Sequence, residues 1–131
     1  MKASDLMIGD YILAKPSMMP IQVAAVHNKK IGYHAVTHKL NWVREGLLEP
    51  IPITPEILEK NGFESTENIF GLKTYKLNDD FILEDRGEKK CLCRNCYKMQ
   101  PSPTFWVYDI EYVHELQNAL RLCKISKTIE L

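Results

Sequence analysis

The last part of the chain carries its clearest hydrophobic pattern. Between Asp109 and Lys124 apolar positions recur every three or four residues, which is the period of an amphipathic helix. Asp109 suits the N-cap position, because its carboxylate can accept hydrogen bonds from the first backbone N–H groups of a helix. The pattern therefore predicts a closing helix over Asp109–Lys124, whose buried stripe consists of Ile110, Val113, Leu116, Leu120 and Cys123.

The first half of the chain is patterned as short strands. Turn residues such as His27-Asn28-Lys29-Lys30 separate short apolar runs. Several such strands within about fifty residues predict a small curled β-sheet or SH3-like barrel over residues 1–50. The expected strands are Tyr11–Ala14, Ile21–Val26, Ile31–Val36 and Leu40–Arg44.

Proline and capping residues mark the start of a second half, residues 51–131. Pro50 and Pro52 predict an extended crossing, because proline withholds a backbone donor and disfavours helix before it. A short helix should follow, with Thr54 as N-cap and Asn61-Gly62 at its end.

Four further apolar runs precede the closing helix and predict an antiparallel β-meander. The fold class is therefore α+β: an N-terminal small curled β-sheet or SH3-like barrel, then a helix, the meander and a C-terminal helix. We expect the two halves to form one compact unit. The meander strands are Leu72–Leu77, Phe81–Glu84, Lys89–Cys93 and Phe105–Tyr108.

Composition favours a cytoplasmic globular protein. The chain is 45% hydrophobic and 26% charged, and no apolar run is long enough to span a membrane. The start, Met1–Leu6, lacks the apolar core of a signal peptide, so the four cysteines are expected to be thiols or metal ligands. Seventeen Lys and Arg cancel seventeen Asp and Glu, which gives no global electrostatic case for nucleic-acid binding.

One local cluster suggests a metal site. On a strand, Cys91 and Cys93 would face the same side, and a turn would bring Cys96 beside Cys93. Thiolates are good zinc ligands, and a structural zinc site takes four ligands. His114 or Cys123 would have to supply the fourth ligand. No second pair stands at the spacing of a structural zinc site, so purely structural thiols without any cofactor are the competing interpretation.

Polar residues along one edge of the closing helix suggest a binding surface. His114, Gln117, Asn118 and Arg121 follow one another at helical spacing beside the apolar stripe. They predict a seam that binds a ligand or partner, although the same groups would equally satisfy buried backbone atoms.

Aromatic residues at the end of the meander suggest a second contact surface. Trp106 and Tyr108 share one face of their strand, which is a contact patch if open and core if covered. Leu122 lies on the polar side of the closing helix and, with an open aromatic face, would indicate an interface or homodimer.

Three blocks of sequence resemble an uncharacterised family of small proteins from gut Bacteroidota and their phages. The blocks are Met1–Leu6 with Ile8-Gly9-Asp10, Leu48–Thr54 continuing through Gly62-Phe63, and Tyr112–Leu120. The chain departs from the family after the last block, where Cys123–Ser126 replaces an aromatic-rich turn containing Thr-Gly. The resemblance implies a cytosolic bacterial or phage accessory protein, and it assigns no functional residue.

No catalytic arrangement is evident, since the chain has neither a phosphate-binding glycine loop nor a nucleophile elbow. We therefore expect a non-enzymatic binding protein that acts through protein–protein contact. One alternative is a zinc-stabilised domain that uses the cysteine cluster and contacts nucleic acid. Another is nucleic-acid binding by the first half through its basic residues, Lys15, Lys29, Lys30, Lys39 and Arg44.

Overall fold

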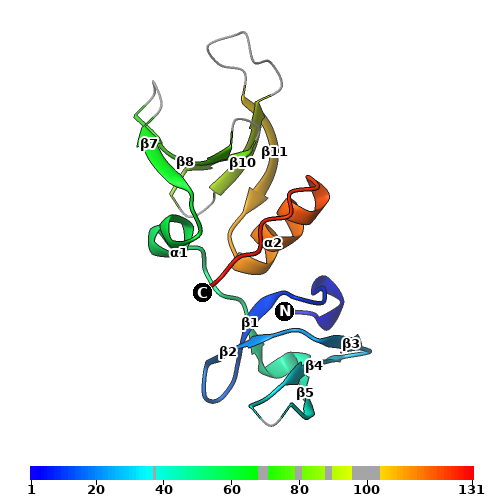
Figure 1. Cartoon of the computed structure of the whole chain (residues 1–131). Helices are drawn as coiled ribbons and strands as arrows, with labels where there is room; N and C mark the ends of the chain where they lie inside the picture. The colour runs from blue at the N-terminus through cyan, green and yellow to red at the C-terminus, as the bar shows by residue number, and fades with distance from the viewer. Residues whose placement is uncertain (37, 68–70, 79–80, 88–89, 96–103) are drawn as a thin grey trace. The chain divides into compact units, whose positions relative to one another are not determined.

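The computed structural model describes residues 1–36, 38–67, 71–78, 81–87, 90–95 and 104–131, with the backbone alone for residues 92–95 and 104–108. The chain forms two compact units, each of which combines helix and antiparallel sheet (Figure 1). The predicted α+β class is confirmed. Unit 1 comprises residues 1–52 and 112–127, and unit 2 comprises residues 53–111 and 128–131. The sequence suggested a division between residues 50 and 51, which groups the closing helix with the second half. In the structure this helix belongs to unit 1.

Unit 1 contains two three-stranded antiparallel sheets, with strand orders β2-β1-β6 and β3-β4-β5. The predicted strands Tyr11–Ala14 and Leu40–Arg44 are found with those limits, whereas SH3-like barrel closure stays a prediction. The elements are η1 (Ala3–Asp5), β1 (Tyr11–Ala14), β2 (Met19–Gln22), β3 (Ala25–His27), β4 (Lys30–His34), β5 (Leu40–Arg44), η2 (Glu45–Leu47), β6 (Leu48–Glu49) and α2 (Val113–Leu122).

The predicted strand Ile21–Val26 is two strands, because the chain changes sheets within it. The Val23 N–H donates to the Asp10 carbonyl at 2.9 Å, on the side of β1. The next residue, Ala24, donates to the Gly32 carbonyl of β4 at 2.7 Å. β2 also begins earlier than predicted and includes Pro20, which is tolerated because β2 is an edge strand.

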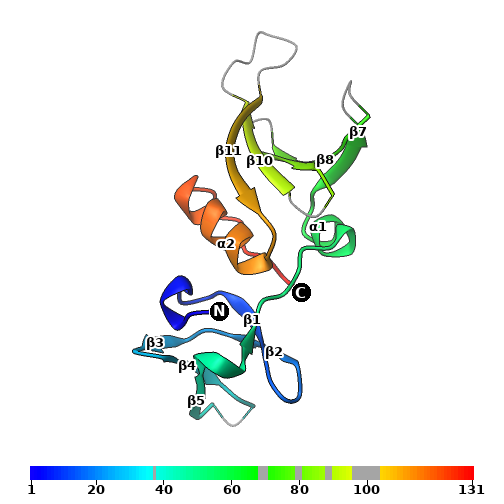
Figure 2. The same cartoon turned by 180° about the vertical axis from the view of Figure 1, so that it is seen from behind.

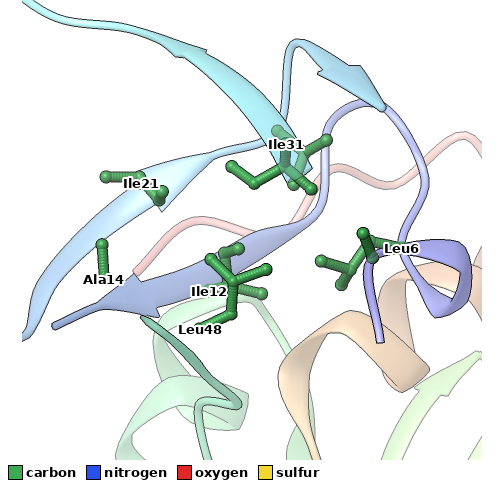
Figure 3. Packing of buried hydrophobic residues seen from close by; sticks show 8 residues of the cluster. Leu6, Ile12, Ala14, Ile21, Ile31 and Leu48 are labelled. Carbon is green, nitrogen blue, oxygen red and sulfur yellow. The ribbon is translucent and has the colours of Figure 1, made fainter. Parts of the chain in front are cut away.

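The core of unit 1 collects the inward residues of both sheets and of η1. Figure 3 shows Ile12 of β1 at its centre, with Leu6, Ile31 and Leu48 around it. Ile12 and Ile31 have no exposed surface. Burying side chains of this size is worth about 1.5–3 kcal/mol each, so this cluster is the main force that holds the two sheets together.

The closing helix begins later than the sequence predicts. α2 starts at Val113, and Asp109 is not its N-cap but lies in the preceding strand, opposite Cys91. The backbone stays extended because the Val113 N–H donates to the Ile51 carbonyl at 2.8 Å. Glu115 then caps the helix by accepting from the Tyr112 N–H at 3.0 Å. Within α2 the predicted stripe is correct: Val113, Leu116 and Leu120 are buried.

Unit 2 is a five-stranded antiparallel meander with one short helix, seen from opposite sides in Figure 1 and Figure 2 as a curved layer. The helix has the predicted capping residues at both ends. At its start Thr54 Oγ1 accepts from the Ile57 N–H at 3.3 Å, and after its end Gly62 has a φ of +85°. Phe63 packs edge-on against Phe81 in the core. The elements are α1 (Pro55–Lys60), β7 (Glu64–Glu67), β8 (Lys73–Asn78), β9 (Phe81–Asp85), β10 (Lys90–Asn95) and β11 (Thr104–Ile110).

The edge strand β7 was not predicted. Its four residues are polar and all exposed, so it shows none of the alternation that marks a half-buried strand. Pairing with β8 holds it in place, through contacts such as the hydrogen bond between the hydroxyls of Thr66 and Thr74 at 2.8 Å. None of the helices in the described part of the chain is long and apolar enough to cross a membrane.

Candidate functional site

The predicted seam on α2 makes contacts inside unit 1. Gln117 accepts from the Tyr11 N–H at 2.8 Å and donates to the Gly9 carbonyl at 3.0 Å. Arg121 donates from Nη1 to Asp10 at 2.7 Å and to Asn118 Oδ1 at 2.7 Å. Gln117 and Arg121 are therefore engaged by the segment that leads into β1, and Asn118 accepts from Arg121 on the same helix.

His114, the first residue of the seam, is buried with 7% of its surface exposed. Its ring stacks on that of Tyr112, with centroids 5.9 Å apart and planes 7° from parallel. Burial lowers its pKa, although the negative charges of Glu115, Asp10 and Asp5 oppose the shift. Its Nδ1 has no hydrogen-bond partner among the described residues.

The other predicted site residues lie in unit 2 and are described less completely. Trp106 and Tyr108 lie on β11, where the structure describes the backbone. Cys91 is buried, and its Sγ donates to Asp109 Oδ1 at 3.3 Å. Cys93 follows an irregularity in the β10–β11 pairing, and Cys96 lies outside the described residues. Among those described, no three His, Cys, Asp or Glu gather as a metal site would require.

A different surface of unit 1 gathers exposed aromatic and basic side chains. In the β3-β4-β5 sheet Ile31 faces the core, with Tyr33 and Val43 packed against it. Strand alternation places the neighbouring residues on the opposite side, here called the outer face. Cross-strand pairs give its two central rows: His27, Lys30 and Arg44 in one, and Ala25, Gly32 and Trp42 in the next.

Trp42 is the largest side chain on the outer face and is 44% exposed. The Lys30 Nζ lies 4.8 Å from its ring centroid, and the ring of His27 approaches it edge-on at 6.4 Å. Leu40, on the same strand as Trp42, covers Gly32, the cross-strand partner of Trp42. A Cβ on Gly32 would lie 3.0 Å from Leu40 Cδ1. The result is an exposed indole ring in a shallow apolar surround, with a cation held over it.

The tight turn between β3 and β4 brings a second lysine to the same edge of the sheet. His27 pairs with Lys30, which leaves Asn28 and Lys29 as the two turn residues. Asn28 adopts a φ of +52°, a left-handed conformation that asparagine tolerates better than most residues.

A hollow of about 740 Å³ adjoins the row of Lys30 and Arg44. Lys29, Lys30 and Arg44 line it together with Glu45, whose carboxylate accepts a hydrogen bond from the Ala3 N–H at 3.0 Å, and the surface of the hollow is mainly apolar. The hollow thus has three basic residues against one acidic residue, and the row of Lys30 and Arg44 lies next to that of Trp42 on the outer face. Its lining residues are Asn28, Lys29, Lys30, Arg44, Glu45, Gly46 and Leu47.

The neutral net charge of the chain conceals two oppositely charged units. Unit 1 contains nine Lys or Arg against five Asp or Glu, and unit 2 contains eight against twelve. The inference from net charge alone was therefore incomplete, because it summed over two units of opposite sign. An electrostatic case for an anionic partner exists for unit 1.

The structure brings together three of the five basic residues that the sequence named as nucleic-acid contacts. Lys29, Lys30 and Arg44 line the hollow. Lys39 lies at the far end of the β4–β5 hairpin, and Lys15 pairs with Glu49, which lowers the pKa of that carboxyl group. The role of Trp42 was missed, although a signal existed: residues 11–44 contain five Lys or Arg, three His and no Asp or Glu.

Comparisons of the chain with protein-family models, with curated proteins and with solved structures found no match. The resemblance to the Bacteroidota and phage family stays a prediction.

Proposed function

We propose that this protein is a non-enzymatic nucleic-acid-binding module that acts through the outer face and the adjoining hollow of unit 1. The observation that supports this most strongly is the convergence of Lys29, Lys30 and Arg44 on one hollow beside an exposed tryptophan. Phosphate neutralisation by Lys and Arg supplies most non-specific affinity for nucleic acid. The proposal keeps the expected binding role and changes the expected partner.

The internal contacts of α2 support this change of partner. A protein interface on the helix seam would need His114, Gln117 and Arg121 to be available to another molecule. His114 and Gln117 are buried, and Arg121 is held by Asp10. In contrast, no acidic side chain among the described residues forms an ion pair with the three cations of the hollow.

The test is fluorescence anisotropy with a labelled 15-nucleotide oligo(dT) and a 15-base-pair duplex, at salt concentrations from 50 to 200 mM. Three phosphate contacts should give a slope of log K against log salt of about −2 for the single strand. The double variant Lys29→Gln/Arg44→Gln should reduce this slope to about −0.7, because one contact is left.

A matched control keeps the change in net charge and moves it elsewhere on unit 1. Lys2 and Lys127 are exposed and lie outside the hollow, so Lys2→Gln/Lys127→Gln should bind almost as the parent does. Equal losses in the two double variants would mean that overall charge, rather than this surface, produces the affinity. If the protein binds neither the single strand nor the duplex at 50 mM salt, the proposal is rejected.

A protein contact or homodimer through α2 is a second candidate, favoured by its exposed apolar residues. Leu122 is 84% exposed, and the adjacent Arg121 donates to the carbonyl of Ile8, which is itself 69% exposed. Sedimentation of the purified protein tests the homodimer: Leu122→Glu should convert a dimer to a monomer. A parent protein that is monomeric at 100 µM would exclude self-association by this surface.

A further inference from the structure

We infer that the outer face selects single-stranded nucleic acid, with one base stacked on Trp42 and the neighbouring phosphate bound beside the hollow by Lys29 and Arg44. This inference rests on the proposed function and adds to it the class of ligand and the role of each residue. In this arrangement the indole ring of Trp42 recognises a base, and the cations recognise the phosphate backbone.

The spacing of the two groups supports this arrangement. Trp42 and Arg44 are two residues apart on β5, on the same face, so their Cα atoms are separated by about 7 Å. This is the length of one step along an extended nucleotide chain. A base on the ring therefore places the next phosphate at the row of Lys30 and Arg44, where the hollow begins.

Lys30 belongs to both parts of the site. Its Nζ lies 4.8 Å from the Trp42 ring centroid and it also lines the hollow. Cation–π contacts at exposed sites are weak compared with the stacking of a base on an aromatic side chain. An arriving base should therefore take the ring, and the ammonium group should turn to the phosphate beside it.

The exposed aromatic ring distinguishes a single strand from the other anionic partners. The bases of a duplex are stacked on one another, so a duplex offers the Trp42 ring no free base face, although its phosphates remain available to the cations. An acidic peptide would satisfy the cations and leave the ring without a partner. Basic side chains next to a stacking aromatic are the combination that binds single strands with little regard to sequence.

The experiment compares the parent protein with Trp42→Ala and Trp42→Phe in oligo(dT) and duplex binding at 50 mM salt. Trp42→Ala should weaken oligo(dT) binding about 10- to 100-fold and leave duplex binding within about 2-fold. Trp42→Phe should stay within about 5-fold of the parent, because phenylalanine also stacks. Circular dichroism melts establish that both variants are folded.

Tryptophan fluorescence supplies a readout that does not depend on affinity alone. The chain contains two tryptophans, Trp42 and Trp106. Saturating oligo(dT) should quench the tryptophan emission of the parent, and the quenching should disappear in Trp42→Phe, where Trp106 is the only tryptophan.

Each outcome decides between the inference and the proposed function. Equal binding of strand and duplex, unaffected by Trp42→Ala, would overturn the inference and leave the proposed function standing. Binding of poly-glutamate as tight as that of oligo(dT) would overturn both in favour of an acidic protein partner. Binding of neither oligonucleotide would also overturn both.

Discussion

Arg121 on α2 and Asp10 before β1 form an ion pair across 111 residues of sequence, with Nη1 and Oδ1 2.7 Å apart. The Asp10 side chain has no exposed surface, and its second oxygen accepts from the Met7 N–H at 2.8 Å. The arginine approaches so closely that a Cβ on Gly9, whose φ is +94°, would lie 2.9 Å from its Nη2. One side chain thus fastens the helix to the segment that leads into the first sheet of unit 1.

Arg121→Ala should lower the free energy of unfolding by about 2–3 kcal/mol, because it leaves a buried carboxylate without its cation. The expected loss is smaller than for a fully buried pair, since the arginine side chain is 34% exposed. Urea unfolding followed by circular dichroism measures it. Leu122→Ala, at the exposed neighbouring position, is the control and should change stability by less than about 0.5 kcal/mol.

Asn61→Ala should release the C-terminal segment of unit 2. The Asn61 side chain is buried, donates to the carbonyls of Ile57 and Glu130 at 2.7 Å, and accepts from the Glu130 N–H at 2.7 Å. Losing these bonds should cost about 2–3 kcal/mol and speed the removal of Leu131 by carboxypeptidase. Asn41→Ala, which breaks one exposed hydrogen bond, should leave the digestion rate unchanged. Equal rates in both variants would contradict the role of Asn61.

Tyr75→Phe should leave the melting temperature unchanged or raise it. Tyr75 is completely buried, and its hydroxyl has no hydrogen-bond partner among the described residues. Removing an unpaired buried hydroxyl takes away a desolvation cost and keeps the packing of the ring. Calorimetry measures the change. A loss of more than about 1 kcal/mol would mean that the hydroxyl is paired.

The free energy of unfolding should fall as the pH is lowered from 7.5 to 5.5. Burial lowers the pKa of His114 in the folded protein, so the unfolded chain binds more protons over this range and acid favours unfolding. Urea titrations at the two pH values should show a smaller pH dependence for His114→Gln than for the parent. The lowered pKa of Glu49 acts below about pH 4.5 and does not interfere. The same pH dependence in both proteins would assign the effect to other groups.

Local signals predicted much of the fold. The limits of α1 follow from Thr54, Pro55 and Gly62, whose preferences depend on adjacent backbone groups alone. β1 and β5 likewise have the limits that turn residues and apolar runs predicted. Elements without a local signal were missed: β7 is polar throughout, and its strand conformation depends on pairing with β8.

The sequence by itself determined the α+β class, the short helix, the apolar stripe of α2 and the polar side chains along its edge, because propensity and periodicity act within a few residues. Tertiary structure alone decided where α2 begins, since pairing with Ile51 keeps the preceding backbone extended. It also decided that Gln117 and Arg121 bind the chain's own backbone and Asp10, and that Lys29, Lys30 and Arg44 meet beside Trp42. Such meetings depend on strand register and sheet packing, which join residues at separations beyond the reach of local propensity and periodicity.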